Sequence, residues 1–366
     1  MSKIRVAIVG VGNCASSLIQ GLYYYQRQDV RPLGLMHEQI ERYGIDDIEP
    51  VVAFDVDSRK VGRNLHDAIF AEPNCTQRFC DKLPATDVVV QMGKCLDGVA
   101  EHMADYDVGQ SFQVANVSEP SADQVIGMLK AAQVDILINY LPVGSQQATE
   151  FYVDCALQAG VGVVNCIPVF IASDSSWQQK FINAGLPIVG DDVKAQFGAT
   201  VLHRQIMKLC QQRGVAVERT YQLNTGGNTD FLNMRNSERI QSKKISKTEA
   251  VQSVLSDPLQ QQDIHVGPSD YVPWQKDNKI AFIRIEGKLF GDVPMNMELR
   301  LSVEDSPNSA AVVVDAIRYC KVAMDRNISG PLLGPSAFCC KHPAKQLDEA
   351  EALKQIDVFL ADAVLA

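Results

Sequence analysis

The sequence predicts an α/β protein with a Rossmann-type, doubly wound parallel sheet and an inserted α+β domain that carries a second, open sheet. Residues 3–9 form an apolar run that is typical of a buried parallel strand, and Gly10 and Gly12 follow it directly. Further apolar runs alternate with helix-like segments through the first half of the chain, as in α/β folds. Residues 280–286 and 296–304 instead alternate apolar and polar side chains, which indicates antiparallel strands with one buried face.

Composition limits the functional class. The chain has 366 residues, 46% of them hydrophobic and 21% charged, which suits two domains or one large α/β core. A formal net charge of −10 argues against nucleic acid as the main partner. No apolar run of about 18 residues is present, so we expect no membrane partner. The N-terminus lacks a signal-peptide layout and none of the ten cysteines forms a Cys-x-x-Cys pair, so we expect a cytoplasmic protein without a metal site.

The first strand leads into a glycine turn and then a helix, which is the context that a dinucleotide fingerprint requires. The pattern departs from Gly-x-Gly-x-x-Gly only at Ala15, and close packing of helix on strand tolerates alanine there. A second strand over 51–57 carries Asp55 where a ribose-binding carboxylate should lie, after an insertion over 22–48. We therefore predict a dinucleotide site; the alternative is a doubly wound scaffold without a cofactor. The candidate residues of the turn are Gly10, Gly12, Asn13, Cys14 and Ala15.

The remaining elements of the first domain follow from periodicity. We predict strands over 85–90, 134–145 (running into a turn), 161–168 and 186–192, and helices over 122–133, 146–159 and 198–213; residues 91–118 are not assigned. Two strands end in Asn followed by Pro, at the edge where Rossmann cofactors bind. Both residue types also favour turns, so that reading stays open. The candidate cofactor residues here are Asn139, Leu141, Pro142, Ser145, Asn165 and Pro168.

The segment 224–247 follows a strand over 215–223 and combines amides, glycines and a carboxylate with three lysines near its end. These lysines are Lys243, Lys244 and Lys247. The pattern from Ser246 to Glu249 predicts a capping box, so we expect a helix to begin at Ser246. Cations at a helix N-terminus are unfavourable unless an anion offsets them. We therefore predict a site for an anion such as phosphate; the alternative is a solvated basic loop.

The last third of the chain completes the predicted organisation. The alternating strands would form an open sheet with one apolar face that is suited to subunit pairing. A helix over 309–326, with Pro307 near its first turn, is apolar enough to return to the first domain, and a charged helix ends the chain. We therefore predict a Rossmann-type domain over 1–198 and 306–366, and an inserted domain over 199–305.

Nine short blocks, in order along nearly the whole chain, carry a family resemblance. They are Gly10-Val-Gly-Asn-Cys-Ala, Phe54-Asp-Val-Asp, Gly190-Asp-Asp-Val-Lys, Asn224-Thr-Gly-Gly-Asn-Thr-Asp-Phe, Ser242-Lys-Lys-Ile-Ser-Lys, Gly267-Pro-Ser-Asp-Tyr-Val-Pro-Trp, Phe290-Gly-Asp-Val-Pro, Glu304-Asp-Ser-Pro-Asn-Ser-Ala and Gly330-Pro-Leu-Leu. Together they resemble the myo-inositol-phosphate synthase family, in the form found in bacteria and archaea.

The resemblance implies cyclisation of D-glucose 6-phosphate to 1D-myo-inositol 3-phosphate for inositol and phospholipid biosynthesis. It implies oxidation at C5, deprotonation at C6, aldol closure on C1 and re-reduction, with NAD as the cofactor, a divalent or monovalent cation as a candidate second cofactor, and a homotetramer. Such a reaction develops an enolate and then an alkoxide, which cationic side chains stabilise.

The resemblance also implies residue roles. Lys243 and Lys279 would lie beside the reacting oxygens, and Lys247 and Lys341 would hold the phosphate or transfer protons. The carboxylates that would orient the lysines are Asp192, Asp230 and Asp305, and Asp192 and Asn228 would also contact the cofactor. At Ala195 the family usually has a serine that helps to bind phosphate. The loss of that hydrogen bond costs roughly 1.5–3 kcal/mol, so we expect weaker phosphate binding or a backbone or water substitute, while a shifted substrate stays open.

Two other functions remain open. A sugar-phosphate dehydrogenase would share the Rossmann half and accumulate NADH, and a non-catalytic sensor would bind NAD and a sugar phosphate without turnover. The lysine and aspartate set argues against the sensor, and only Ala195 favours it. Because lysines around an empty anion site repel one another, we also predict that residues 228–247 are mobile without a ligand.

Overall fold

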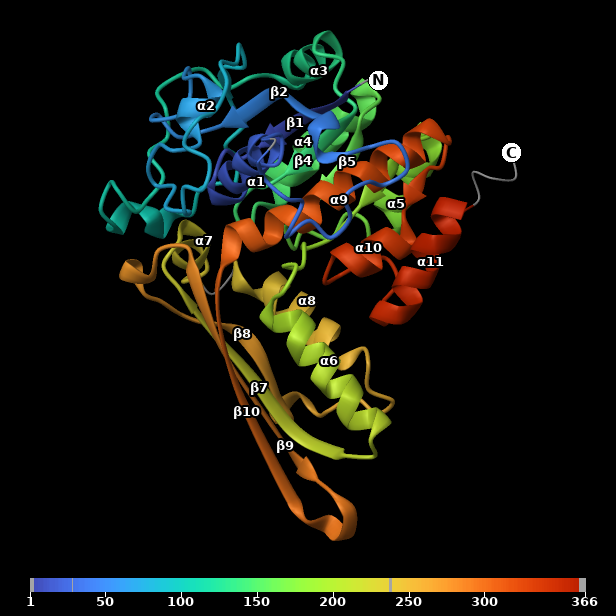
Figure 1. Ribbon diagram of the computed structural model, residues 1–366. Helices are drawn as coiled ribbons and strands as arrows, with labels where there is room; N and C mark the ends of the chain where they lie inside the picture. Colours follow the sequence, from blue (N-terminus) through green and yellow to red (C-terminus); the bar gives the residue numbers. More distant parts are fainter. Residues whose placement is uncertain (1–2, 28, 237–238, 362–366) are drawn as a thin grey trace.

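The computed structural model, which describes residues 3–27, 29–236 and 239–361, contains two sheets (Figure 1). The first sheet has seven strands in the order β11-β6-β5-β4-β1-β2-β3, and all of its pairs are parallel. The order 3-2-1-4-5-6 is that of Rossmann folds, so the predicted fold class is confirmed. The strands are β1 (Ile4–Val9), β2 (Ile48–Asp55), β3 (Val90–Met92), β4 (Ile136–Asn139), β5 (Gly162–Asn165), β6 (Pro187–Val189) and β11 (Gly330–Pro331).

Helices cover both faces of this sheet because each strand buries side chains on both sides. The helices α1 (Asn13–Tyr24) and α9 (Asp305–Asp325) pack on one face with Ile4, Val6 and Ile8. The helices α3 (Ala122–Ala131), α4 (Gln146–Ala159) and α5 (Ser175–Ala184) pack on the other face. The shorter or peripheral helices are α2 (Leu65–Ala68), α10 (Leu333–Cys339), α11 (Glu349–Ala361) and the 3₁₀ turns at Ile45–Asp47 and Glu101–Asp105.

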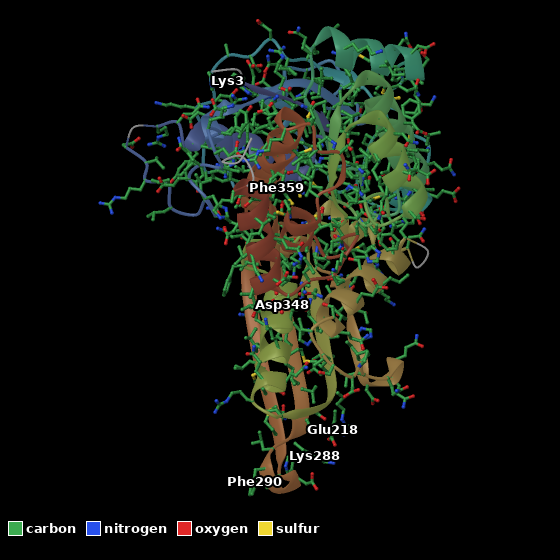
Figure 2. All side chains as sticks on the ribbon, turned by 90° about the vertical axis from the view of Figure 1, so that its right-hand side faces the viewer. Lys3, Glu218, Lys288, Phe290, Asp348 and Phe359 are labelled. Carbon is green, nitrogen blue, oxygen red and sulfur yellow. The ribbon has the colours of Figure 1, made fainter. Side chains whose placement is uncertain are left out.

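The second sheet has four strands in the order β10-β9-β7-β8 and is open at both edges. The pair β7–β8 is parallel and the other two pairs are antiparallel, as predicted for β9 and β10. The elements of this part are α6 (Ala199–Gln212), β7 (Ala216–Gly226), α7 (Thr229–Asn233), α8 (Ile240–Gln252), β8 (Ile264–Tyr271), β9 (Asn278–Lys288), β10 (Pro294–Glu304) and the 3₁₀ turns Gln261–Asp263, Pro273–Gln275 and Phe290–Asp292. The hairpin of β9 and β10 extends far from the first sheet, and Phe290 is fully exposed at its tip (Figure 2).

We propose that residues 199–305 form an inserted unit between two parts of the Rossmann-type unit. Helix α6 begins this segment and packs on β7 and α8, while α9 follows β10 directly and runs back beneath the first sheet (Figure 1). The C-terminal helices α10 and α11 pack on one another, and α10 also packs on α9. The junctions at residues 198 and 305 therefore bring both units to one place, where the polar side chains described below meet.

Two predicted element boundaries are wrong by five residues or more. The strand expected over 85–90 begins only at Val90, because the residues before it bond to an antiparallel strap: the N–H of Leu65 donates to the carbonyl of Val88 at 2.8 Å. The helix expected to begin at Ser246 begins at Ile240. Ser246 lies inside it, and its hydroxyl donates to the carboxylate of Asp192 instead of capping the helix.

The expectation of a free apolar face on the second sheet is also wrong in part. The helices α6 and α8 pack on that face, together with the buried side chains of Ile264, Ile283 and Ile285. The β10 side of the face stays half-exposed through Met295, Met297, Leu299 and Leu301, and Val217 of β7 is also half-buried. The apolar surface available for subunit pairing is therefore smaller than the alternation pattern suggests.

Candidate active site

The glycine turn after β1 leaves the start of helix α1 open. Gly10 has φ +93°, and a Cβ there would lie 2.7 Å from the carbonyl oxygen of Tyr140. A Cβ at Gly12 would meet nothing within 4 Å, so the space over the first turn is clear. Ala15 is fully buried against the sheet, where a larger side chain would separate helix and strand.

The first turn of α1 presents backbone N–H groups that can donate hydrogen bonds to a ligand. The N–H groups of residues 13–15 have no hydrogen-bond acceptor within the described part of the chain. The 12-residue helix that follows adds its dipole at the same point, so the turn suits a pyrophosphate. This observation fits the dinucleotide that the fingerprint predicts.

Asp55 ends β2 beside this turn. Its carboxylate accepts the N–H of Val11 at 2.7 Å, and its second oxygen accepts the N–H groups of Val56 and Asp57 at 2.8 Å each. Lys60 Nζ lies 3.7 Å away. Asp55, Val56 and Lys60 line a cavity between the ends of β1, β2 and β4, where the ribose and base of a dinucleotide would fit.

The other strand-end candidates fall into two groups. Leu141 and Pro142 line both cavities of the cofactor region. Asn139 and Asn165 are instead buried and bonded to each other at 2.9 Å, which ties the ends of β4 and β5 together. The remaining two, Ser145 and Pro168, are buried and do not line either cavity among the described residues.

Asn13 and Cys14 face different surroundings. Asn13 Oδ1 accepts hydrogen bonds from the N–H groups of Cys75 and Thr76 at 2.7 and 3.0 Å, so it holds the loop that contains these two residues against α1. Cys14 lines the larger cavity next to Ser309, 3.6 Å from its sulfur. Burial raises the pKa of the Cys14 thiol to about 12, so it stays protonated and is not a nucleophile at neutral pH.

The larger cavity lies between the two units and collects the charged residues that the sequence singles out. All seven predicted catalytic side chains line it, from six separate parts of the chain. They are Asp192, Asp230, Lys243, Lys247, Lys279, Asp305 and Lys341. Four lysines against three aspartates leave an excess of one positive charge when all are ionised.

Asp192 is the hub of these contacts. Its carboxylate is fully buried and lies 3.2 Å from Lys243 Nζ and 3.0 Å from Lys341 Nζ. Burial alone would raise the pKa of Asp192, but Lys243 and Lys341 hold it well below its usual range. Lys279 pairs separately with Asp305 at 2.9 Å, and this lysine likewise lowers the pKa of Asp305 against the effect of burial.

The lysines differ in their electrostatic state. Burial lowers the pKa of Lys243, but Asp192 and then Asp230 outweigh it, so its pKa is raised and it stays cationic. Burial and the neighbouring lysines lower the pKa of Lys341, although Asp192 opposes this.

Lys247 is the exception among these side chains. It is 2% exposed and has no hydrogen-bond or ion-pair partner among residues 3–27, 29–236 and 239–361. Burial, reinforced by Lys279, Lys243 and Lys341, lowers its pKa well below the usual lysine value. The cavity thus holds a cation, Lys243, next to an amine that can exist in its neutral form.

Sequence reasoning missed several groups that complete the site. Asp277 is buried and joins three elements: it accepts hydrogen bonds from Asn228 Nδ2 at 2.9 Å and from Ser306 Oγ at 2.8 Å. Burial raises its pKa to about 6. Asn228 also caps α7 through the N–H groups of Asp230 and Phe231. Ser306 lies within the block over residues 304–310 that carries the resemblance, and this signal could have identified it, whereas Asp277 lies outside all of the blocks.

Ala195 lines the cavity beside the first turn of α6. The N–H groups of residues 199–201 have no hydrogen-bond acceptor within the described ranges. Three N–H donors and the dipole of a 14-residue helix make this turn suited to an anion even without a hydroxyl at position 195.

Two features are absent from the described ranges. No group of three or more His, Cys, Asp or Glu side chains there could hold a metal ion. No helix in the same ranges is long and apolar enough to cross a membrane. All ten cysteines are free thiols.

Comparisons with known proteins agree on one group. The family described as myo-inositol-1-phosphate synthase matches residues 198–306. The inositol-3-phosphate synthase of Mycolicibacterium smegmatis is 51% identical over 98% of each chain, and that of Corynebacterium glutamicum is 47% identical over 99% of each. The crystal structure of a myo-inositol-1-phosphate synthase-related protein from Thermotoga maritima superposes with a TM-score of 0.82 over 98% of each chain, at 24% identity, and this likeness supports the fold.

Proposed function

The chain belongs to the myo-inositol-1-phosphate synthase family and is an enzyme of the inositol-3-phosphate synthase type, and from this we propose that it cyclises D-glucose 6-phosphate to 1D-myo-inositol 3-phosphate with NAD as cofactor. The cavity between the two units is the proposed site of this reaction. The observation that carries the proposal is the arrangement of four lysines and three aspartates there, in which Lys243 is held cationic and Lys247 has no partner in the described part of the chain.

The reaction needs both a proton carrier and fixed positive charge. Lys247, with its lowered pKa, can accept a proton from C6 of the substrate as a neutral amine. Lys243 and Lys279 provide positive charge for the enolate and for the alkoxide that follows ring closure, and the carboxylates of Asp192 and Asp305 orient these two lysines. Fixed charges in a buried cavity stabilise such anions more than water does, because they need no reorganisation.

The phosphate of the substrate is proposed to bind at the first turn of α6. The N–H groups of residues 199–201 would donate to its oxygens, so binding would not depend on the hydroxyl that Ala195 lacks, although a serine there would add a further hydrogen bond. Lys341 would supply a countercharge. Binding of the dianion would raise the pKa of a lysine beside it, so we expect proton uptake when phosphate binds.

NAD is proposed to lie along the glycine turn, with its ribose at Asp55 and its reactive end near Leu141 and Pro142. When bound, it would accept a hydride from C5 of the sugar and return it after ring closure. Asn228 and Asp192 would lie between cofactor and sugar, at the junction of the two units.

The assembly and compartment are part of the same proposal. The open second sheet, with Phe282 42% and Phe290 100% exposed, supports pairing of subunits into a homotetramer. Ten free thiols suit the reducing cytoplasm. A monovalent or divalent cation remains a proposed second cofactor.

The test is to incubate the protein with NAD and glucose 6-phosphate and to follow phosphorus NMR and absorbance at 340 nm. A new inositol phosphate signal without a steady rise in NADH would support the cyclase. NADH that rises in step with substrate loss would mean a dehydrogenase, the second candidate. If NAD binds but neither signal appears, the protein is a sensor or takes another substrate.

A further inference from the structure

We propose that Arg239 is a positioning residue that fastens the lysine-bearing helix α8 to the cofactor-binding turn of the Rossmann-type unit, so that cofactor binding aligns Lys243 and Lys247. This inference rests on the proposed function for its catalytic consequence. It concerns a residue that precedes α8 and lines neither cavity.

The guanidinium of Arg239 joins segments that are far apart in sequence. It donates to the carbonyl of Val143 at 3.1 Å, to Asn233 Oδ1 at 3.2 Å and to the carbonyl of Asp97. The Val143 turn lines the larger cavity, and Cys95 and Gly98 on either side of Asp97 line the cofactor cavity. One side chain therefore bridges two walls of the proposed cofactor site and the start of α8.

The two segments that Arg239 contacts, the Asp97 loop and the Gly144 turn, are themselves held in place. The carboxylate of Asp97 accepts the N–H groups of Gln147 and Ala148 at 2.8 and 3.0 Å, so the Asp97 loop is fixed to the N-terminus of α4. Gly144 has φ +88°, and a Cβ there would lie 2.6 Å from Arg239 Cγ. The aliphatic part of Arg239 thus lies directly on the glycine backbone, a contact that no other residue type at position 144 would permit.

Asn233 and Arg239, which flank the connector before α8, both donate to the carbonyl of Val143. Asn233, at the end of α7, is fully buried and donates to the carbonyl of Val143 at 2.7 Å, the same carbonyl that accepts from Arg239. Helix α8 begins one residue after Arg239, and Lys243 and Lys247 follow one and two turns later. A shift of Arg239 would therefore move both lysines relative to Leu141 and Pro142.

A lysine could replace this arginine only in part. The three acceptors are uncharged oxygens, and each accepts from a different N–H group of the planar Arg239 guanidinium. The ammonium group of a lysine is a compact charge on a flexible side chain and cannot reach all three acceptors in this geometry. The arrangement suits orientation rather than charge neutralisation.

Three variants test the inference: Arg239→Ala, Arg239→Lys and, as a control, Arg235→Ala, which alters an exposed arginine of the same connector. We expect Arg239→Ala to lower kcat by about 10- to 100-fold, the scale of a misplacement near 1 Å. Added guanidinium ion should restore much of that loss, and an equal concentration of NaCl should not. Arg239→Lys should be intermediate, and Arg235→Ala should match the wild type.

Hydrogen exchange gives a readout independent of turnover. NAD should slow exchange of the amides of residues 240–252 in the wild type and in Arg235→Ala, but not in Arg239→Ala. The inference is overturned if Arg239→Ala keeps its kcat, if guanidinium gives no rescue, or if NAD protects α8 equally in the wild type and in Arg239→Ala. If Arg239→Ala fails to fold, kcat and the hydrogen exchange of residues 240–252 are measured on Arg239→Lys instead.

The proposed function and this inference fail differently. A wild-type protein that makes no inositol phosphate would refute the former, while the exchange experiment with NAD would still decide the latter. An active wild type with an equally active Arg239→Ala variant would refute only the role of Arg239.

Discussion

Replacing Lys247 by methionine should stabilise the ligand-free protein and abolish its turnover. Lys247 is 2% exposed, and its amine has no hydrogen-bond or ion-pair partner in the ranges 3–27, 29–236 and 239–361. Burial and three neighbouring lysines lower its pKa, so folding disfavours the protonated form that the unfolded chain carries at pH 7. Methionine has a similar length and fills the space without an unpaired donor.

The size of the effect follows from the missing partner. Burying a polar group without a hydrogen bond costs about 1–3 kcal/mol in proteins, so the free energy of unfolding should rise by a similar amount at pH 7. Because the folded-state pKa is lowered, Lys247 destabilises the protein most below that pKa. The penalty fades as pH rises toward the unfolded value of about 10.4. The gain from Lys247→Met should therefore shrink across the alkaline range.

The assay is urea-induced unfolding at several pH values, followed by tryptophan fluorescence, beside product formation by phosphorus NMR. Turnover should fall by about 10²- to 10⁴-fold, the usual contribution of a proton-transferring side chain. Lys244→Met on the same helix is the control, since Lys244 is exposed and should change stability by less than about 0.5 kcal/mol. A Lys247→Met protein that is less stable than the wild type at pH 7, or that keeps most of its kcat, would refute the reasoning.

Four further outcomes are expected. Asp192→Asn should lower the free energy of unfolding by about 3–5 kcal/mol at pH 7. Since its pKa is depressed by two lysines, this contribution is present above pH ~3.9 and is lost as pH falls toward the folded value, which urea titrations in acid would show. Ala195→Ser should lower KM for glucose 6-phosphate about tenfold or more through a hydrogen bond worth roughly 1.5–3 kcal/mol; an unchanged KM would argue against phosphate at α6. Gly10→Ala should weaken NADH binding at least about tenfold in a fluorescence titration, because the new Cβ would lie 2.7 Å from Tyr140 O at φ +93°. Amides of residues 228–247 should exchange rapidly until phosphate and NAD are added, and full protection in the free protein would contradict this.

The features that the sequence predicts best have a local physical signature. A glycine after an apolar strand, as at Gly10, marks a backbone that only glycine adopts without strain, and the structure gives it a positive φ. Continuous apolar runs identify parallel strands, so β1, β4 and β5 lie within their predicted ranges. Both signals depend only on residues that are close in sequence, so they can be recognised without knowledge of the fold.

Features set by distant contacts could not be predicted. Residues 85–89 have strand-forming side chains, but the strap at Leu65 takes up their backbone groups. Asp277 is buried only because β9 brings it against α7 and α9, where Asn228 and Ser306 donate to it. Its neighbours in sequence give no indication of that environment.

The sequence predicts the start of α8 at the wrong residue because the functional side chains at its beginning interrupt the apolar periodicity of the helix. The inward side of α8 consists of Lys243, Ser246, Lys247, Ala250 and Val251, which have the spacing i, i+3, i+4, i+7 and i+8 of a buried helical stripe. In the second half of the helix this stripe is apolar, and sequence periodicity finds it. In the first half the same stripe faces the cavity and is polar, so the pattern that identifies a helix is absent. A helix whose buried face is partly devoted to charge therefore looks like a loop followed by a shorter helix, and the Ser246 motif then offers a false N-terminus.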